Sequence, residues 1–84
     1  ADDPGLLAHE LTHVGQWWRA PLTHGRCYRD SEAYRFRCER DAFRAQLRAY
    51  PVEHQDYYLD KLAKRLATYY GFGLTPDEAA EALR

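Results

Sequence analysis

The spacing of apolar residues predicts that the chain is helical along most of its length. Over residues 2–20, leucine, valine and tryptophan recur at helical intervals, as in a helix with one apolar side. An acidic residue followed by Pro4 is a typical helix start, and Pro21 ends the segment because the residue before a proline disfavours helical geometry. We interpret residues 20–30 as a loop, since Pro21 and Gly25 interrupt them.

Three further segments carry helical signals. From residue 30 or 31 to about residue 50 there is no glycine or proline, and we predict a long second helix. A third helix is predicted over about 53–70, with one apolar stripe that we assign to the core. The last helix, 75–84, begins with a capping threonine, a proline at the first helical position and a glutamate three residues after the cap. The core stripe consists of Leu59, Leu62, Leu66 and Tyr69.

These segments predict a single all-α domain over residues 1–84, a small bundle of about four helices. The net charge of −1 gives no electrostatic signature of nucleic-acid binding, and the arginines are interspersed with acidic residues. No segment approaches the roughly 18 consecutive apolar residues of a membrane helix. We therefore expect neither a nucleic acid nor a membrane as partner, and we interpret Cys27 and Cys38 as ordinary thiols.

One motif on the first predicted helix carries chemistry. His9, Glu10 and His13 form the pattern H-E-x-x-H. Residues four apart lie on the same side of a helix, so both imidazoles can reach one metal ion at about 2.0–2.1 Å. Glu10 is turned from His9 by about 100°, which keeps it off the metal but near a water that the metal binds. Zinc lowers the pKa of such a water toward about 7, and Glu10 can accept its proton as the water attacks a carbonyl.

The surroundings of the motif favour a metal site over a coincidental histidine pair. The same helix carries apolar residues, and we expect it to bury them as the backing of the site. We also expect at least one of Trp17 and Trp18 to cover the core. The residues of the expected apolar backing are Leu6, Leu7, Leu11 and Val14.

A catalytic zinc site has three protein ligands and one water, so a third ligand must come from elsewhere in the chain. Glu39 and Glu32 both lie on the second predicted helix, two turns apart. If that helix returns antiparallel to the first, Glu39 lies about 12 Å from its start, and His13 lies about 9 Å from the end of the first helix. Glu39 therefore fits better. Glu32 is the alternative, and His24, in the predicted loop, is a weaker candidate.

Two segments resemble gluzincins, a group of zinc metallopeptidases. Residues 8–16 read A-H-E-L-T-H-V-G-Q and resemble the active-site helix of small bacterial gluzincins, with the pattern A-H-E-x-x-H-V-x-Q. Residues 39–47 read E-R-D-A-F-R-A-Q-L and are similar to the second helix of ImmA/IrrE-type metallopeptidases. An alternative alignment sets residues 31–33 against the N-E-A of thermolysin-like enzymes, which makes Glu32 the ligand.

The resemblance implies a zinc site and an activity. It implies that His9, His13 and Glu39 hold the zinc ion, and that Glu10 is the general base and later the general acid of peptide-bond hydrolysis. In thermolysin-like enzymes an aspartate four residues after the ligand supports a histidine, but no aspartate stands there in either alignment. Asp41 is the nearest substitute.

A second departure concerns the substrate cleft. Gluzincins usually have a small sheet before the motif helix, and its edge strand pairs with the extended substrate. Only eight residues precede His9 here, so we expect an open cleft or one that a partner or an upstream segment completes. Candidates for stabilising the oxyanion are Tyr34, Tyr50, Tyr57 and His54.

The sequence therefore predicts a zinc metallopeptidase that acts on a peptide or protein substrate. The alternative is a catalytically idle structural or protein-binding module that zinc staples together, and the expected lack of an edge strand motivates it. The coordination of the metal distinguishes the two. An idle site is expected to have four protein ligands, with His24 or a cysteine as the fourth, whereas a peptidase keeps one position open.

Overall fold

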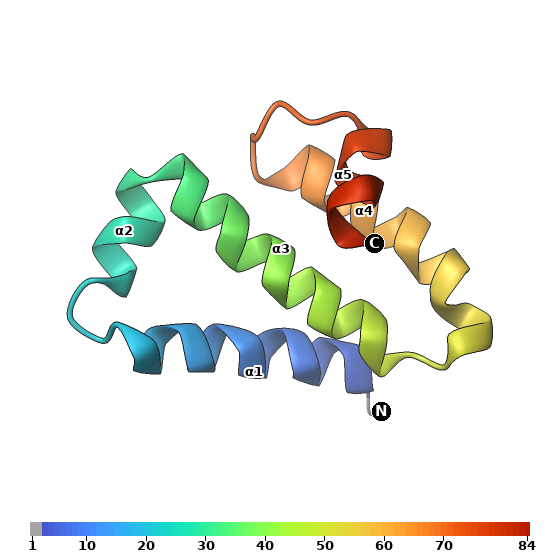
Figure 1. The fold of residues 1–84 in the computed structure, drawn as a ribbon, viewed down its shortest axis with the longest axis horizontal. Helices are drawn as coiled ribbons and strands as arrows, with labels where there is room; N and C mark the ends of the chain where they lie inside the picture. Colours follow the sequence, from blue (N-terminus) through green and yellow to red (C-terminus); the bar gives the residue numbers. More distant parts are fainter. Residues whose placement is uncertain (1–2) are drawn as a thin grey trace.

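The computed structural model describes residues 3–84, except for the side chain of Tyr69, and its regular elements are all helical (Figure 1). No strand occurs among these residues, so the predicted all-α class is confirmed, with five α-helices where we expected about four. Within residues 3–84, no helix combines the length and the apolar character that a membrane crossing requires. The elements are α1 (Pro4–Arg19), α2 (His24–Asp30), α3 (Glu32–Ala49), the 3₁₀ turn η1 (Val52–His54), α4 (Gln55–Tyr69) and α5 (Pro76–Leu83).

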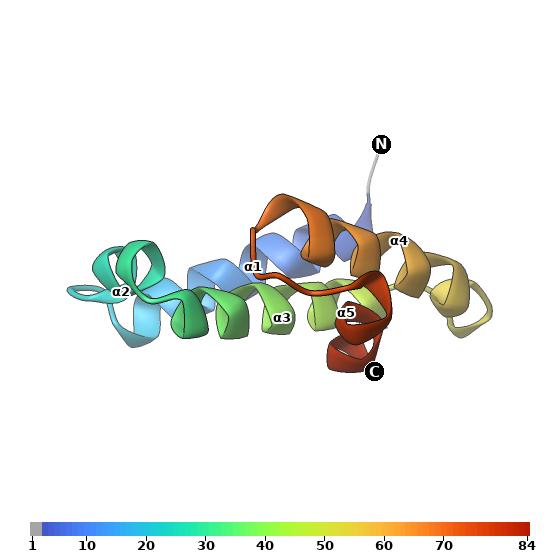
Figure 2. The same cartoon turned by 90° about the horizontal axis from the view of Figure 1, so that it is seen from above.

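Helix α3 lies at the centre of a flat molecule. It contacts α1 and α2 on one side and α4 and α5 on the other (Figure 1). The chain measures 39 × 29 × 20 Å, and the view from above shows how thin the arrangement is (Figure 2). Helix α3 returns roughly antiparallel to α1, and α2 joins them at the end far from the N-terminus (Figure 1).

The predicted starts of α1 and α5 are confirmed by their caps. The carboxylate of Asp3 accepts hydrogen bonds from the backbone N–H groups of Gly5 and Leu6, which α1 itself cannot satisfy. At α5, Thr75 and Glu78 form a capping box, in which each side chain accepts a hydrogen bond from the other residue's backbone N–H. These ends are encoded locally, by residues at most three positions apart.

Helix α2 was not predicted, and our interpretation of residues 20–30 as a loop is wrong for residues 24–30. Gly25, in its first turn, disfavours helix by about 1 kcal/mol relative to alanine. Contacts with α3 offset this cost. Nδ1 of His24 lies 2.8 Å from the hydroxyl of Tyr34, and the hydroxyl of Tyr28 donates a hydrogen bond to Glu39. Helix α2 is thus stabilised by tertiary contacts that a local pattern does not reveal.

The apolar core lies between α3, α4 and α5. The expected stripe on α4 takes part in it: Leu62 and Leu66 are buried and Leu59 packs against the cluster, while the side chain of Tyr69 lies outside the described part of the chain. Helix α1 contributes no residue to this cluster. Cys27 and Cys38 are free thiols, as we interpreted them. The core consists of Phe43, Leu47, Leu62, Ala63, Leu66, Ala79 and Leu83.

Helix α1 exposes the apolar residues that we expected it to bury, and that prediction is wrong. They are between 45% and 69% exposed, and neither tryptophan covers the core. The side that α1 buries carries Gly5, His9 and Gln16 instead. The reason is that the two histidines and Gln16 find partners on α3, which fixes the orientation of the helix and turns its apolar side to solvent. The exposed residues are Leu6, Leu7, Leu11, Val14, Trp17 and Trp18.

Candidate metal centre

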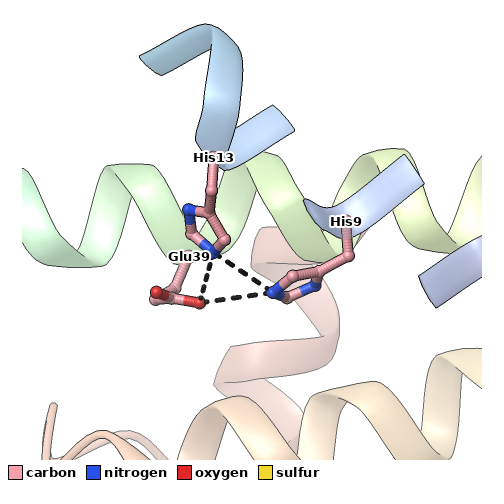
Figure 3. A group of neighbouring side chains, drawn as sticks. All are labelled: His9, His13 and Glu39. Carbon is pink, nitrogen blue, oxygen red and sulfur yellow. Dashed lines mark hydrogen bonds and ion pairs between the residues drawn. The ribbon is translucent and has the colours of Figure 1, made fainter. Parts of the chain in front are cut away.

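The structure brings the three predicted ligand residues together between α1 and α3 (Figure 3). His9 and His13 lie one turn apart on α1, and their Nε2 atoms are 3.2 Å from each other. Glu39 reaches them from the middle of α3, with its Oε1 3.6 Å from Nε2 of His9 and 3.3 Å from Nε2 of His13. The antiparallel return of α3 therefore sets Glu39 beside the histidines.

The spacing of these three atoms suits one small metal ion. Ligand atoms that sit about 2.0–2.1 Å from a tetrahedral zinc ion lie about 3.3–3.4 Å from one another. The separations in this structure are 3.2, 3.3 and 3.6 Å. His9, His13 and Glu39 could therefore hold a metal ion with only small side-chain movements.

A chain of hydrogen bonds fixes the tautomer of His9. Its Nδ1 lies 3.0 Å from Oε1 of Gln46, whose amide NH₂ donates to the hydroxyl of Tyr50. That hydroxyl donates to the carboxylate of Asp3, so the amide of Gln46 must turn its oxygen toward the histidine. Nδ1 of His9 then carries the proton, and Nε2 of the neutral ring presents a lone pair to the site.

The same logic applies to His13. Its Nδ1 lies 2.9 Å from Oε1 of Gln16, and Nε2 of that glutamine donates to the backbone carbonyl of Cys38. A carbonyl can only accept, which fixes the amide of Gln16 with its oxygen toward His13. In the neutral ring, Nε2 of His13 is therefore also an unprotonated acceptor, aimed at the same point as Nε2 of His9.

Glu39 brings a buried negative charge to these two acceptors. Its side chain is only 3% exposed, and Oε1, the atom that faces the histidines, has no hydrogen-bond partner among the described residues. Burial alone raises the pKa of Glu39, but the imidazoles of His13 and His9, which can donate to it when they are protonated, and the hydroxyl of Tyr28 outweigh burial and hold that pKa well below its usual range. Three acceptor atoms around one point favour a positive charge there, and a divalent metal ion could contact all three.

A proton is the competitor of the metal at this point. The carboxylate of Glu39 raises the pKa of His13 above its ordinary value, although burial of the ring opposes this. In the metal-free protein the cluster therefore attracts a proton to His13. Since a metal needs the neutral imidazole, metal binding at this site would release that proton.

Glu10, the predicted base, lies next to the three ligand residues and outside their cluster. It is exposed, and it lines a cavity of about 220 Å³ that also borders His9 and Tyr70. Glu10 is not one of the three residues whose ligand atoms converge, and its role as the base stays a prediction. A substrate in this cavity would lie against both Glu10 and the ligand His9.

Two tyrosines that sequence reasoning missed flank Glu39. The hydroxyl of Tyr28, on α2, donates to Oε2 of Glu39, and burial raises the pKa of this tyrosine far above its usual value. Tyr70 follows α4, and burial, then the charge of Glu39, raises its pKa to about 12. Both hydroxyls thus keep their protons at neutral pH, and that of Tyr28 donates its proton to Glu39. No sequence signal singles out these two among seven tyrosines.

The other residues weighed from the sequence lie outside the cluster. Glu32 is exposed at the first position of α3, and His24 is engaged with Tyr34. Tyr50 supports His9 through Gln46, and Asp41 pairs with Arg40 rather than with a histidine. Tyr57 and His54 do not border the cavity that holds Glu10.

Support for the histidines comes from glutamines instead of an aspartate. Phe43, four residues after Glu39, packs against His9 in an edge-to-face arrangement with the ring centroids 4.7 Å apart. Gln46 and Gln16 supply the hydrogen bonds. The sequence could have indicated this support, because helical spacing places each glutamine on the same side of its helix as a proposed ligand. Gln16 lies three residues after His13, and Gln46 lies two turns after Glu39.

Among residues 3–84, the cluster that could hold a metal contains three residues and no fourth protein ligand. A comparison of the chain with protein families, curated proteins and solved structures finds no match. The interpretation of the site therefore depends on its own geometry and chemistry.

Proposed function

We propose that this chain is a zinc-dependent metallopeptidase that hydrolyses peptide bonds. The observation that carries the proposal is the convergence of two histidine Nε2 acceptors and the buried, unpaired Oε1 of Glu39, with Glu10 beside them. The resemblance of residues 8–16 to the active-site helix of gluzincins supports the same activity.

The donor set favours zinc among divalent metals. Two imidazole nitrogens and one carboxylate oxygen are the ligands of many catalytic zinc sites, and the separations match tetrahedral geometry. Calcium and magnesium prefer six or more oxygen ligands, which His9 and His13 do not offer. When bound, zinc lowers the pKa of a water and polarises the substrate carbonyl.

Glu10 carries the proton in this proposal. It accepts a proton from the attacking water and then donates it to the nitrogen of the leaving amine. Gln46 and Gln16 keep both imidazoles in the tautomer that presents Nε2. Tyr70, which lines the same cavity as Glu10, is the proposed donor to the oxygen of the attacked carbonyl.

The first experiment measures the zinc content of the purified chain beside Glu39→Ala. We expect one zinc per wild-type chain and a sharp fall in the variant. The matched control is Glu32→Ala, which removes the exposed glutamate at the start of the same helix and should leave the zinc content unchanged. Full zinc in Glu39→Ala would show that the ligand assignment is wrong.

The second experiment tests the chemistry. Glu10→Gln should keep its zinc but lose hydrolysis of a broad peptide library by about 100-fold or more. Undiminished hydrolysis by this variant would exclude Glu10 as the base.

The alternative function is an idle module in which zinc only joins α1 to α3. One observation favours it: no strand occurs among the described residues, so none of them offers an edge to an extended substrate. A zinc absorption-edge spectrum of the loaded chain discriminates between the two. Four protein ligands, with His24 or a cysteine as the fourth, indicate the idle module, and an open position supports the peptidase.

A further inference from the structure

The cavity beside Glu10 is bordered by a cation that the proposed hydrolysis does not use. Its walls come from α1, α3 and α4, and they include Leu6, Phe43 and Tyr70 as well as Arg65. At about 220 Å³ it is smaller than the roughly 300–1,000 Å³ of pockets for drug-sized ligands, and so suits a single amino-acid residue.

Arg65 is available to a ligand. No carboxylate of residues 3–84 lies within ion-pairing distance of its guanidinium group. Its charge is felt by Asp3, whose pKa it helps to lower, but the carboxylate of Asp3 is already engaged by the N–H groups of Gly5 and Leu6. Arg65 and Tyr70 line the same cavity.

The charges around the cavity favour an anionic ligand once the metal is bound. Glu39 and Glu10 together would balance a divalent ion, and Arg65 would then be the remaining charged group among the residues that line the cavity. The planar guanidinium group of an arginine matches a carboxylate and can donate two parallel hydrogen bonds to it.

We propose that this cavity is a carboxylate-binding subsite in which Arg65 recognises an anionic group of the substrate next to the bond that is cleaved. The inference deepens the proposed peptidase function and rests on it for the identity of the substrate as a peptide. The carboxylate has two sources in a peptide, an acidic side chain or the free C-terminus, and Arg65 serves either.

Three small probes separate these sources. Acetyl-glutamate amide carries only a side-chain carboxylate, acetyl-glutamine carries only an α-carboxylate, and acetyl-glutamine amide carries neither. Binding of each is titrated by NMR with zinc-loaded and with zinc-free full-length chain. We expect one of the two anionic probes to bind zinc-loaded chain about tenfold or more tightly than the neutral probe, with a weaker preference without zinc.

Arg65→Gln is the decisive variant. It removes an exposed charge and should leave the fold intact, which circular dichroism verifies. The preference for the anionic probe should disappear in it and persist in the matched control Arg48→Gln, which removes an exposed arginine from the last turn of α3. Added salt should weaken the preference, because an exposed ion pair is screened.

The outcomes separate this inference from the proposed hydrolysis. Equal binding of all three probes by the wild-type chain, or a preference that Arg65→Gln retains, would overturn the subsite whatever the zinc content or activity. A preference that depends on Arg65 in a chain without hydrolytic activity would support the subsite and leave the proposed hydrolysis contradicted.

Discussion

The two sides of α3 are packed in different ways. On the side of α4 and α5 the contacts are apolar, with Phe43 and Leu47 set against Leu62 and Leu66. On the side of α1 they are polar, and the central partners of His9 are Gln46 and Glu39. The first side follows the usual rule of hydrophobic burial, and the second reverses it, since the apolar side of α1 faces solvent.

This difference shows which helix contacts depend on the proposed metal site. Burial of apolar area is non-directional and stabilises α3, α4 and α5 without a ligand. The contact between α1 and α3 relies on directed hydrogen bonds and, in our proposal, on a metal ion held by His9, His13 and Glu39. The exposed stripe Leu7, Leu11, Val14 and Trp18 has the four-three-four spacing of helices that pack against another element.

The largest expected effect comes from breaking the apolar side. Leu66 is fully buried, and Leu66→Ala should lower the free energy of unfolding by about 3–4 kcal/mol, through lost burial and the cavity left behind. Urea unfolding followed by circular dichroism measures it. Leu11→Ala, at an exposed position of α1, is the control and should cost less than about 1 kcal/mol. Equal losses of unfolding free energy in the two variants would contradict the conclusion that the apolar core lies on the α4 and α5 side of α3.

Removing the metal should weaken the polar side selectively. At free zinc 100-fold above its dissociation constant, binding stabilises the fold by about 2.7 kcal/mol, and a chelator abolishes this gain. Amide hydrogen exchange should then speed up in α1 far more than in α4, because only α1 is held through the site. Uniform acceleration in both helices, or none in either, would be the contrary result.

Two glycines on α1 offer a matched pair for the same interface. A Cβ on Gly5 would overlap the ring of Tyr50, the residue that supports His9 through Gln46, so Gly5→Ala should destabilise the chain by about 1–3 kcal/mol. A Cβ on Gly15 meets no neighbouring atom, and Gly15→Ala should stabilise by about 0.5–1 kcal/mol. Thermal unfolding of both variants measures the signs, and the same sign for both would show that α1 does not dock as described.

The smallest expected effect is on how the free energy of unfolding depends on pH, which should differ in sign between metal-free and zinc-loaded chain. Glu39 raises the pKa of His13, so in metal-free protein the protonated ring contributes stability that is complete below its unfolded value of 6.5 and is lost as pH rises through the higher folded pKa. Glu39, whose pKa is lowered, stays ionised throughout this range. Metal-free chain should therefore lose about 1 kcal/mol or less between roughly pH 6 and 8.

Zinc should change the sign of that dependence. The metal requires neutral imidazoles, so zinc-loaded chain should become more stable as pH rises over the same range. Urea midpoints with zinc and with chelator give both slopes. Parallel slopes in the two forms would mean that His13 does not bind the metal.

The sequence predicted those features that depend on short spacings. The cap at Asp3, the capping box at Thr75 and the pairing of His9 with His13 all involve residues at most four positions apart. Glu39 could be chosen over Glu32 because helical rise and an antiparallel return were sufficient to place it.

The features that the sequence did not predict depend on contacts between helices. Helix α2 forms because Tyr28 and His24 find partners on α3, and its own residues give no such signal. The buried side of α1 was predicted wrongly because an apolar stripe normally faces the core. Here the hydrogen bonds of His9 and Gln16 to α3 set the orientation.

Both tryptophans of the chain, Trp17 and Trp18, lie side by side on α1, with their ring centroids 5.1 Å apart. Tryptophan fluorescence, excited selectively, therefore reports on this one helix, whereas far-ultraviolet circular dichroism averages over all the helices. The chain thus carries a built-in optical label on the element that also holds two of the three proposed ligands. Binding of a metal, a substrate or a partner at α1 can be followed by that emission without any added dye.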